Sequence, residues 1–261
     1  MADTKLALIT GASSGIGLEL AKLFAAHDYD LVVAAEDDAI RDVPDQLSGY
    51  SAEIRPVQVD LRTSDGVEHL FASCIEGGRT LDAAALNAGI GRGGMFLETE
   101  LTDDLSIIDL NVRSTVHLAK LVLRDMANRE EGKVLFTSSV ASMMPGSYQT
   151  VYNASKSFIQ SFAEALQDEL RDTSITVTSL MPGPTDTDFF RRANLLNAPV
   201  GKLPKDDPAQ VARQGFEALM RGDRKVAAGS VTSKLMGTVS RVLPDNVKAM
   251  GSRLISAPLG R

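Results

Sequence analysis

Short apolar runs alternate with longer segments of helical spacing along most of the chain, and no other feature constrains the fold as strongly. After the first run, apolar residues recur every three or four positions, at Ile16, Leu20, Leu23 and Phe24. Such alternation predicts an α/β fold, a doubly wound parallel sheet covered by helices on both faces. The seven expected strands are Leu6 to Thr10, Leu31 to Ala35, Ile54 to Val59, Ala83 to Leu86, Val134 to Thr137, Ile175 to Leu180 and Val226 to Ala228.

Nothing along the 261 residues divides them into two units, so we expect a single domain over 1–261. Two long helices are expected, at about Asp104 to Arg129 and Tyr152 to Arg171. Residues 182–208 contain five prolines and follow the sixth strand at the ligand edge of the sheet, which predicts a substrate lid. Residues 230–261 predict an amphipathic C-terminal tail, with a helix broken at Pro244.

Composition excludes several classes of protein. The formal net charge of −7 repels phosphate backbones, so no nucleic-acid partner is expected. No apolar stretch approaches 18 residues, so we expect no membrane span. His27, His69 and His117 lack the spacing of metal ligands, so no metal is expected. The single Cys74, expected to be buried, forms no internal disulfide, which favours a reducing, cytoplasmic location.

A glycine-rich turn, TGASSGIG from Thr10 to Gly17, lies between the first strand and the first helix. Glycines let the main chain approach a pyrophosphate closely, and the start of a helix offers free N–H groups with a partial positive charge. The alternative is a tight turn that binds no ligand. The candidate phosphate-binding residues are Gly11, Ser13, Ser14, Gly15, Ile16 and Gly17.

An acidic cluster follows the second strand. Glu36 lies nineteen residues after Gly17, near the spacing at which a carboxylate takes the ribose hydroxyls of a dinucleotide. Asp37 and Asp38 follow it, and negative charge there repels a 2′-phosphate, which favours NAD(H) over NADP(H). The alternative is a solvated loop that caps the next helix.

Groups suited to proton transfer occur together after the fifth strand. Ser139 ends that strand, Tyr152 follows thirteen residues later, and Lys156 lies one helical turn beyond Tyr152. A neighbouring ammonium is expected to lower the pKa of the phenol by about 1 to 3 units and so make it a better acid and base. Ser139 is expected to bond a substrate oxygen. The alternative is a packed tyrosine beside a solvated lysine.

These motifs together resemble the short-chain dehydrogenase/reductase family, in its compact single-domain branch, over about Lys5 to Ala228. The resemblance implies a Rossmann-type fold and hydride transfer between a nicotinamide coenzyme and a carbonyl or secondary alcohol. Its motifs are the Thr10 to Gly17 loop, Asp60-Leu61, Asn87-Ala88-Gly89, Asn111, Ser139, Tyr152 with Lys156, and Pro182-Gly183-Pro184-Thr185-Asp186-Thr187.

The resemblance also implies residue roles. Tyr152 is the acid and base, Lys156 binds the nicotinamide ribose, Ser139 orients the substrate, and Asn111 anchors a water in a proton relay. The remaining residues contact the coenzyme or support it, and their alternatives are helix caps and turns. Asp60 contacts adenine, Asn87 stabilises the sheet beside the coenzyme, and Thr187 holds the nicotinamide carboxamide or the phosphates. The other coenzyme-binding candidates are Leu61, Ala88, Gly89, Pro182, Gly183 and Thr185.

Two features depart from the family pattern. Ser14 and Glu36 stand where NADP-dependent members usually carry a basic residue, yet Ala35 stands where NAD-dependent members usually carry Asp. The tail from Ser230 to Arg261 lacks the common Asp-Gly-Gly ending. We expect a homo-oligomer, a dimer or tetramer, although Leu118, Val122, Phe158 and Phe162 on the long helices would equally suit the core.

The residues expected near the reacting carbonyl are mostly apolar, which predicts a lipophilic small-molecule substrate. The alternative is that the methionines merely fill the core. A non-catalytic redox sensor or scaffold also fits a dinucleotide-binding fold, whereas a nucleotide-sugar epimerase normally needs a larger C-terminal domain. The candidate substrate residues are Ser139, Met143, Met144, Gln149, Phe189 and Phe190, with the turn from Gly91 to Phe96.

Overall fold

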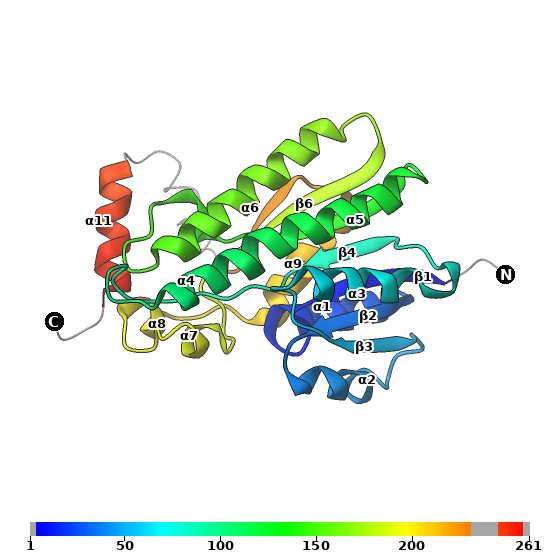
Figure 1. Ribbon diagram of the computed structural model, residues 1–261, viewed down its shortest axis with the longest axis horizontal. Coiled ribbons are helices and arrows are strands. Elements are labelled where there is room, and N and C mark those ends of the chain that lie inside the picture. Colours follow the sequence, from blue (N-terminus) through cyan, green and yellow to red (C-terminus); the bar gives the residue numbers. More distant parts are fainter. Residues whose placement is uncertain (1–3, 231–244, 258–261) are drawn as a thin grey trace.

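The computed structural model describes residues 4–230 and 245–257. Its seven strands form one parallel sheet, as predicted (Figure 1). The strand order is β3-β2-β1-β4-β5-β6-β7. The order reverses between β1 and β4, which is where open sheets of this kind bind ligands. The strands are β1 (Lys5–Thr10), β2 (Tyr29–Ala35), β3 (Ile54–Gln58), β4 (Ala83–Leu86), β5 (Glu131–Thr137), β6 (Ser174–Pro182) and β7 (Lys225–Ala228).

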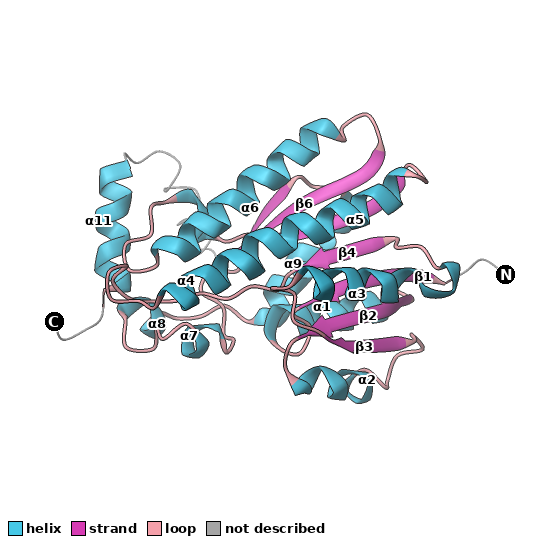
Figure 2. Ribbon diagram, in the orientation of Figure 1, coloured by secondary structure: helices cyan, strands magenta, loops and turns pink. Residues whose placement is uncertain are grey.

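Helices cover both faces of this sheet (Figure 2). The α-helices are α1 (Gly15–Ala25), α2 (Val43–Gln46), α3 (Ser64–Ile75), α4 (Leu101–Ile107), α5 (Thr115–Ala127), α6 (Thr150–Glu169), α7 (Phe189–Arg192), α8 (Pro199–Lys202), α9 (Pro208–Arg221) and α11 (Asp245–Ser256). Shorter helical segments are η1 (Asp38–Asp42), η2 (Glu76–Gly78), η3 (Ile108–Ser114) and η4 (Val140–Met143).

Alternate residues of the strands supply two separate apolar cores. Ala7 and Ile9 of β1 pack with α1 and α9, whereas Leu6 and Leu8 pack with α3, α5 and α6. Period-two alternation of buried apolar residues on both faces is the pattern of a parallel sheet covered on each side. Since both faces are covered, ligands have access only at the ends of the strands.

The predicted helix from Asp104 to Arg129 is a compound element. It consists of α4, the π-helical segment η3 and α5, and it spans residues 101–127. The periodicity gave no sign of the π-helical turns, which add residues without breaking the helix and often mark functional sites. The other long helix, α6, starts two residues before the predicted Tyr152 and ends two before Arg171.

The apolar residues of the long helices mostly face the core. Leu118 and Val122 are buried, and Phe162 packs partly against the same cluster. Phe158, which stacks on Phe162, is 42% exposed. Of the four residues considered for an oligomer surface, only Phe158 is therefore available for one.

Residues 182–208 have structure of their own. They carry α7 and α8 and a small apolar cluster that includes Phe190, Leu195 and Val200. Ile255 of α11 packs on this cluster, and α11 stands beside α8 at the end of the molecule away from the N-terminus (Figure 1). The helix predicted from Leu235, Met236, Val239, Val242 and Leu243 lies outside the described residues. Within the described residues, no helix is long and apolar enough to cross a membrane.

Candidate active site

One pocket lies at the carboxyl ends of the strands, and most of the predicted site residues line it. Its wall includes residues of the glycine-rich turn after β1, residues at the ends of β2 to β6, and residues of α11. The predicted residues that line it include Gly11, Ser13, Ser14, Gly15, Ile16, Glu36, Asp60, Leu61, Asn87, Ala88, Gly89, Ser139, Tyr152, Lys156, Pro182, Gly183, Thr185 and Thr187.

The glycine-rich turn and the start of α1 form a cradle at one end of the pocket. Gly11 and Gly15 have φ values of 66° and 56°. A Cβ on Gly11 would lie 3.0 Å from Ala88 Cα, and one on Gly15 would lie 2.8 Å from Thr187 Cγ2. These two glycines let the turn pack closely on the loop after β4 and on the segment after β6. Because the turn and the start of α1 also line the pocket, and the first N–H groups of a helix are free to bond an anion, the residues present fit a pyrophosphate.

Gly17 does not line the pocket, although the sequence prediction placed it there. A Cβ on Gly17 would lie 2.0 Å from the carbonyl oxygen of Gly11. Gly17 therefore allows α1 to pack against the turn. A glycine is needed at this position for packing and not for contact with a ligand.

At the end of β2, a cation that the sequence analysis missed holds two of the predicted acids. Arg62 Nη2 lies 2.7 Å from Glu36 Oε2, and Arg62 Nε lies 2.8 Å from Asp60 Oδ1. The hydrogen bond from Arg62 lowers the pKa of Asp60. Arg62 comes two residues after Asp60, but nothing in its spacing distinguishes it from an ordinary surface arginine.

Asn87 links the ends of three strands. Its Nδ2 donates to the carbonyl oxygen of Thr10 at 3.1 Å, and its Oδ1 accepts from Thr137 Oγ1 at 3.1 Å. Its main-chain N–H donates to Thr10 Oγ1 at 2.9 Å. These contacts are what the implied role of Asn87, holding the sheet beside the coenzyme, requires.

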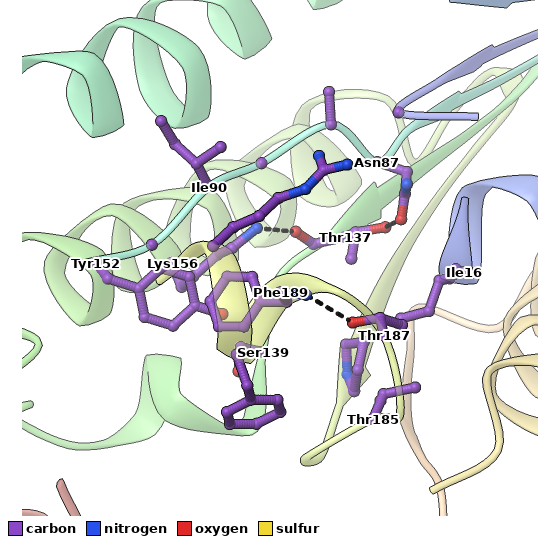
Figure 3. Close-up of a pocket in the computed structure, with 18 of the residues that line it drawn as sticks. Ile16, Asn87, Ile90, Thr137, Ser139, Tyr152, Lys156, Thr185, Thr187 and Phe189 are labelled. Carbon is purple, nitrogen blue, oxygen red and sulfur yellow. Dashed lines mark hydrogen bonds between the residues drawn. The ribbon is translucent and has the colours of Figure 1, made fainter. Parts of the chain in front are cut away.

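Tyr152 and Lys156 lie close together in the middle of the pocket (Figure 3). Lys156 is 5% exposed, its Nζ donates to the carbonyl oxygen of Thr137 at 2.8 Å, and it lies 6.0 Å from the centre of the Tyr152 ring. Ser139, at the start of η4, accepts a hydrogen bond from the Ala141 N–H at 3.1 Å. The spacing thus brings phenol, ammonium and hydroxyl together, as predicted.

The predicted direction of the Tyr152 pKa shift is wrong for this state of the protein. Burial raises the pKa of Tyr152 to about 12, and a hydrogen bond with Ser139 only opposes that rise. Burial also lowers the pKa of Lys156 to about 8, so its ammonium is itself destabilised. Loss of hydration penalises both charged forms and outweighs their mutual attraction.

Asn111 lies behind the pocket wall rather than on it. Its Nδ2 donates to Ile90 O and Ser155 Oγ, each at 2.9 Å, and its Oδ1 accepts from the Ile90 N–H at 2.9 Å. The side chain therefore holds the loop after β4 against α6. It comes from η3, and no signal in the sequence marked that π-helical segment.

The predicted substrate residues are divided. Met144, Gln149, Phe189 and Phe190 line the pocket with Ser139, but Met143 does not. Met143 is the last residue of η4, whereas Met144 follows it in extended backbone, so the two neighbouring side chains do not share one wall.

The loop after β4 contributes less than predicted. Gly91 lines the pocket, but Met95 and Phe96 are 41% and 55% exposed. The loop leaves the pocket after its first residues, and hydropathy alone does not show that change of direction.

The C-terminal helix supplies a part of the wall that the sequence analysis missed. Ser252, Ile255 and Ser256 of α11 line the pocket, and Gln149 Nε2 donates to Ser256 Oγ at 2.9 Å. These residues are more than 100 positions from Gln149 along the chain, so only the fold brings them there.

Phe189 covers the tyrosine. Its ring centre lies 5.1 Å from that of Tyr152, with the rings tilted by 47°. A Cβ on Gly91 would lie 2.6 Å from Phe189 Cζ, so this glycine makes room for the ring. The segment 182–208 thus contacts Tyr152 directly through Phe189 (Figure 3).

The geometry and the comparisons with known proteins agree. The family model described as short chain dehydrogenase matches residues 5–196. The chain is a short-chain dehydrogenase/reductase. It is 31% identical to the oxidoreductase UcpA of Salmonella typhimurium over 218 residues, 82% of this chain and 80% of that protein. As a member of this family, the chain is an NAD(P)-dependent oxidoreductase.

Solved short-chain dehydrogenases have the same fold. The Burkholderia phymatum enzyme in complex with NAD superposes with a TM-score of 0.83 at 24% identity, covering 99% of both chains. The Sphingobium yanoikuyae enzyme in complex with NADPH gives a TM-score of 0.79 at 24% identity, over 85% of this chain and 87% of that one. One of these relatives holds NAD and the other NADPH, so the fold does not decide the coenzyme.

Proposed function

We propose that this short-chain dehydrogenase/reductase transfers a hydride reversibly between NAD(H) and the carbonyl or secondary alcohol carbon of a lipophilic small molecule. The observation that carries the proposal is one pocket lined by the glycine-rich turn at one end and by Tyr152, Lys156 and Ser139 at the other. Fixing coenzyme, substrate and proton donor in one cavity turns a many-body encounter into an oriented reaction.

The residues of this chain handle the proton and the substrate oxygen. A bound nicotinamide supplies the hydride for reduction and accepts it in the reverse direction. Tyr152 donates its hydroxyl proton to the carbonyl oxygen, and with a pKa raised to about 12 it holds that proton at neutral pH. Ser139 hydrogen-bonds the same oxygen and stabilises the charge that develops there. Lys156 contacts the nicotinamide ribose.

Replacing Tyr152 with Phe tests the assignment. The variant is expected to bind NADH with little change in affinity, while turnover falls by about 100-fold or more because the proton donor is lost. Tyr148→Phe is the matched control, since Tyr148 does not line the pocket. The readouts are NADH absorbance with a panel of ketones and secondary alcohols, and NADH binding. Turnover retained by Tyr152→Phe would refute the assignment, and binding without turnover by the unaltered protein would favour the redox-sensor alternative.

The preference for NAD(H) rests on charge at the end of β2. Glu36 and Asp60 carry two negative charges, and Arg62, which pairs with both, supplies one positive charge. Asp37 also lines the pocket. A 2′-phosphate entering there would meet net negative charge, whereas ribose hydroxyls can donate to a carboxylate.

The proposals of a lipophilic substrate and of a lid are based on the other end of the pocket. Met144, Phe189, Phe190, Val200 and Ile255 make its wall largely apolar. Three of these belong to 182–208, the proposed lid. Hydrogen exchange over this segment with and without NADH tests the lid, and identical protection would contradict it.

Three further proposals concern domain organisation, oligomeric state and location. We propose that residues 1–261 form a single domain, which is supported by the packing of Ile255 on the apolar cluster of residues 190–200. A homo-oligomer is supported by apolar side chains exposed on α4, η3 and α6, and light scattering would test it. A cytoplasmic location is supported by Cys74, which is buried, with burial raising its pKa to about 12. The exposed apolar side chains are Leu101, Leu105, Ile108 and Phe158.

A further inference from the structure

Acidic side chains outnumber basic ones among the described residues that line the pocket, and one of the few basic residues is Arg192. Among the described residues that line the pocket, the acids are Glu36, Asp37, Asp60 and Asp188, and the cations are Lys156 and Arg192. Lys156 bonds the carbonyl of Thr137 at the proton-transfer end. A dinucleotide brings two further negative charges in its pyrophosphate, so Arg192 is the lining cation left to offset them.

Arg192 lies at the edge of the glycine cradle. It is the last residue of α7, and its Nη2 lies 3.6 Å from Asp37 Oδ2. The same carboxylate oxygen accepts a hydrogen bond from Ser13 Oγ at 3.0 Å. Since Ser13 belongs to the glycine-rich turn, a single carboxylate separates the guanidinium from the phosphate-binding turn.

A second contact places this part of the lid on the cradle. Thr187 Cγ2 would lie only 2.8 Å from a Cβ on Gly15, so the chain passes directly against the turn five residues before Arg192. Two independent contacts, one apolar and one ionic, therefore hold residues 187–192 beside the start of α1, where a pyrophosphate would bind.

The ion pair with Asp37 is of a kind that exchanges easily. The Arg192 and Asp37 side chains are 46% and 33% exposed. A half-exposed pair at this separation contributes little, because water and salt screen it. A pyrophosphate offers two charges and several acceptor oxygens, to which a guanidinium can bond in bidentate fashion.

We propose that Arg192 is a coenzyme-binding residue, which leaves Asp37 and bonds the pyrophosphate when a nicotinamide dinucleotide enters. The proposal rests on the function proposed above. It assigns the lid a direct contact with the coenzyme, in addition to its contact with Tyr152 through Phe189. Asp37 then holds Arg192 in place before the coenzyme arrives and competes with the phosphates for it.

The neighbouring arginine is a matched control. Arg191 Nη2 bonds Asp188 Oδ2 at 2.9 Å within the same short helix, and Arg191 does not line the pocket. Arg191→Gln and Arg192→Gln therefore remove the same charge from adjacent positions, and only the second removes it from the cradle.

The experiment measures binding to the full-length protein. The chain has no tryptophan, so enhancement of NADH fluorescence reports binding without protein background, and ADP-ribose and adenosine are used as competitors. Arg192→Gln is expected to weaken NADH and ADP-ribose about tenfold, the loss of one charge-assisted bond, and to leave adenosine unchanged. Arg191→Gln is expected to change none of the three. Thermal melting shows whether each variant is folded.

Binding of inorganic pyrophosphate tests the competition with Asp37. Asp37→Asn is expected to strengthen pyrophosphate binding about threefold in the unaltered chain, and by clearly less in Arg192→Gln, where only the repulsion by Asp37 is removed. An equal gain in both backgrounds would contradict the competition.

Equal affinity of the two arginine variants for NADH would overturn the proposal. If Arg192→Gln lost affinity for adenosine as much as for NADH, the proposal would also be overturned, because that result would indicate a distorted site. An unaltered protein that binds neither NADH nor ADP-ribose would instead refute the proposed function itself.

Discussion

At the scale of single residues, burial sets the properties of the proton-transfer group. Lys156 is almost wholly enclosed, and its Nζ has one protein acceptor, the Thr137 carbonyl. Burial lowers its pKa from 10.5 to about 8. Holding this ammonium in the folded protein therefore costs stability, and the site retains it because the proposed chemistry needs a cation beside the ribose and the phenol.

The stability cost of Lys156 gives a pH-dependent prediction. Between pH 8 and 10.5 the unfolded chain binds a proton that the folded protein does not, so this residue makes the free energy of unfolding rise with pH. The cost is fully present below pH 8. Lys156→Met removes it, and the stability of the variant relative to the unaltered protein should fall by about 2 kcal/mol between pH 7 and 9.5.

Urea unfolding at the two pH values is the measurement. Lys120→Met, which removes an exposed ammonium, serves as the control and should follow the unaltered protein. The interval stops below pH 10 because the raised pKa of Tyr152 acts in the opposite sense above it. A Lys156→Met profile parallel to that of the unaltered chain would show that burial does not shift this lysine.

Glu36 is expected to decide the coenzyme. Glu36→Arg reverses the charge beside the adenosine ribose and releases Arg62, so the ratio of kcat/KM for NADPH to that for NADH should rise tenfold or more. Steady-state rates with both coenzymes measure it. Asp38→Arg is the control, because Asp38 is 86% exposed and does not line the pocket. An unchanged ratio in Glu36→Arg would remove Glu36 from the coenzyme site.

At the scale of elements, the close fit of α1 against the glycine-rich turn forms the cradle. Gly17 allows that fit, because any Cβ there would collide with the carbonyl oxygen of Gly11. The helix must start close to the turn if its free N–H groups are to face a phosphate. Packing of the element and binding of the ligand therefore depend on the same glycine, although it contacts no ligand.

Gly17→Ala is therefore expected to destabilise the fold, although alanine is the better helix former by about 1 kcal/mol. The clash should cost about 2 kcal/mol or more, lowering the melting temperature by about 5 °C and weakening NADH binding. Gly49→Ala is the control, because none of the described residues lies within 4 Å of a Cβ added at Gly49. Its melting temperature should equal that of the unaltered protein. Calorimetry measures both, and equal melting of the two variants would mean that α1 can shift away without cost.

At the scale of the whole molecule, the end of the pocket proposed to bind substrate is formed by the sheet edge, the proposed lid and α11. Phe190 and Val200 of the lid share an apolar cluster with Ile255 of α11. The hydrogen bond from Gln149 to Ser256 joins α11 to the segment before α6. We therefore expect the proposed lid and α11 to limit substrate size together.

Enlarging Ile255 should narrow this end selectively. Ile255→Trp is expected to raise KM for bulky ketones about tenfold, and to leave both small ketones and NADH binding unaffected, because the coenzyme cradle lies at the other end. Leu254→Trp adds the same ring at a position that is 72% exposed and should have no effect. A uniform change for all ketones would argue against α11 as a size-selecting wall.

Patterns among neighbouring residues predicted the seven strands, the glycine-rich turn and the Tyr152–Lys156 pair, because each of these depends on residues close together in the chain. The tertiary structure decided what depends on distant contacts. It removed Gly17 and Met143 from the pocket wall and placed Asn111 behind it. It also added Arg62 and α11 to the site and reversed the expected pKa shift of Tyr152. Burial and packing arise only when distant segments meet, and no local pattern records them.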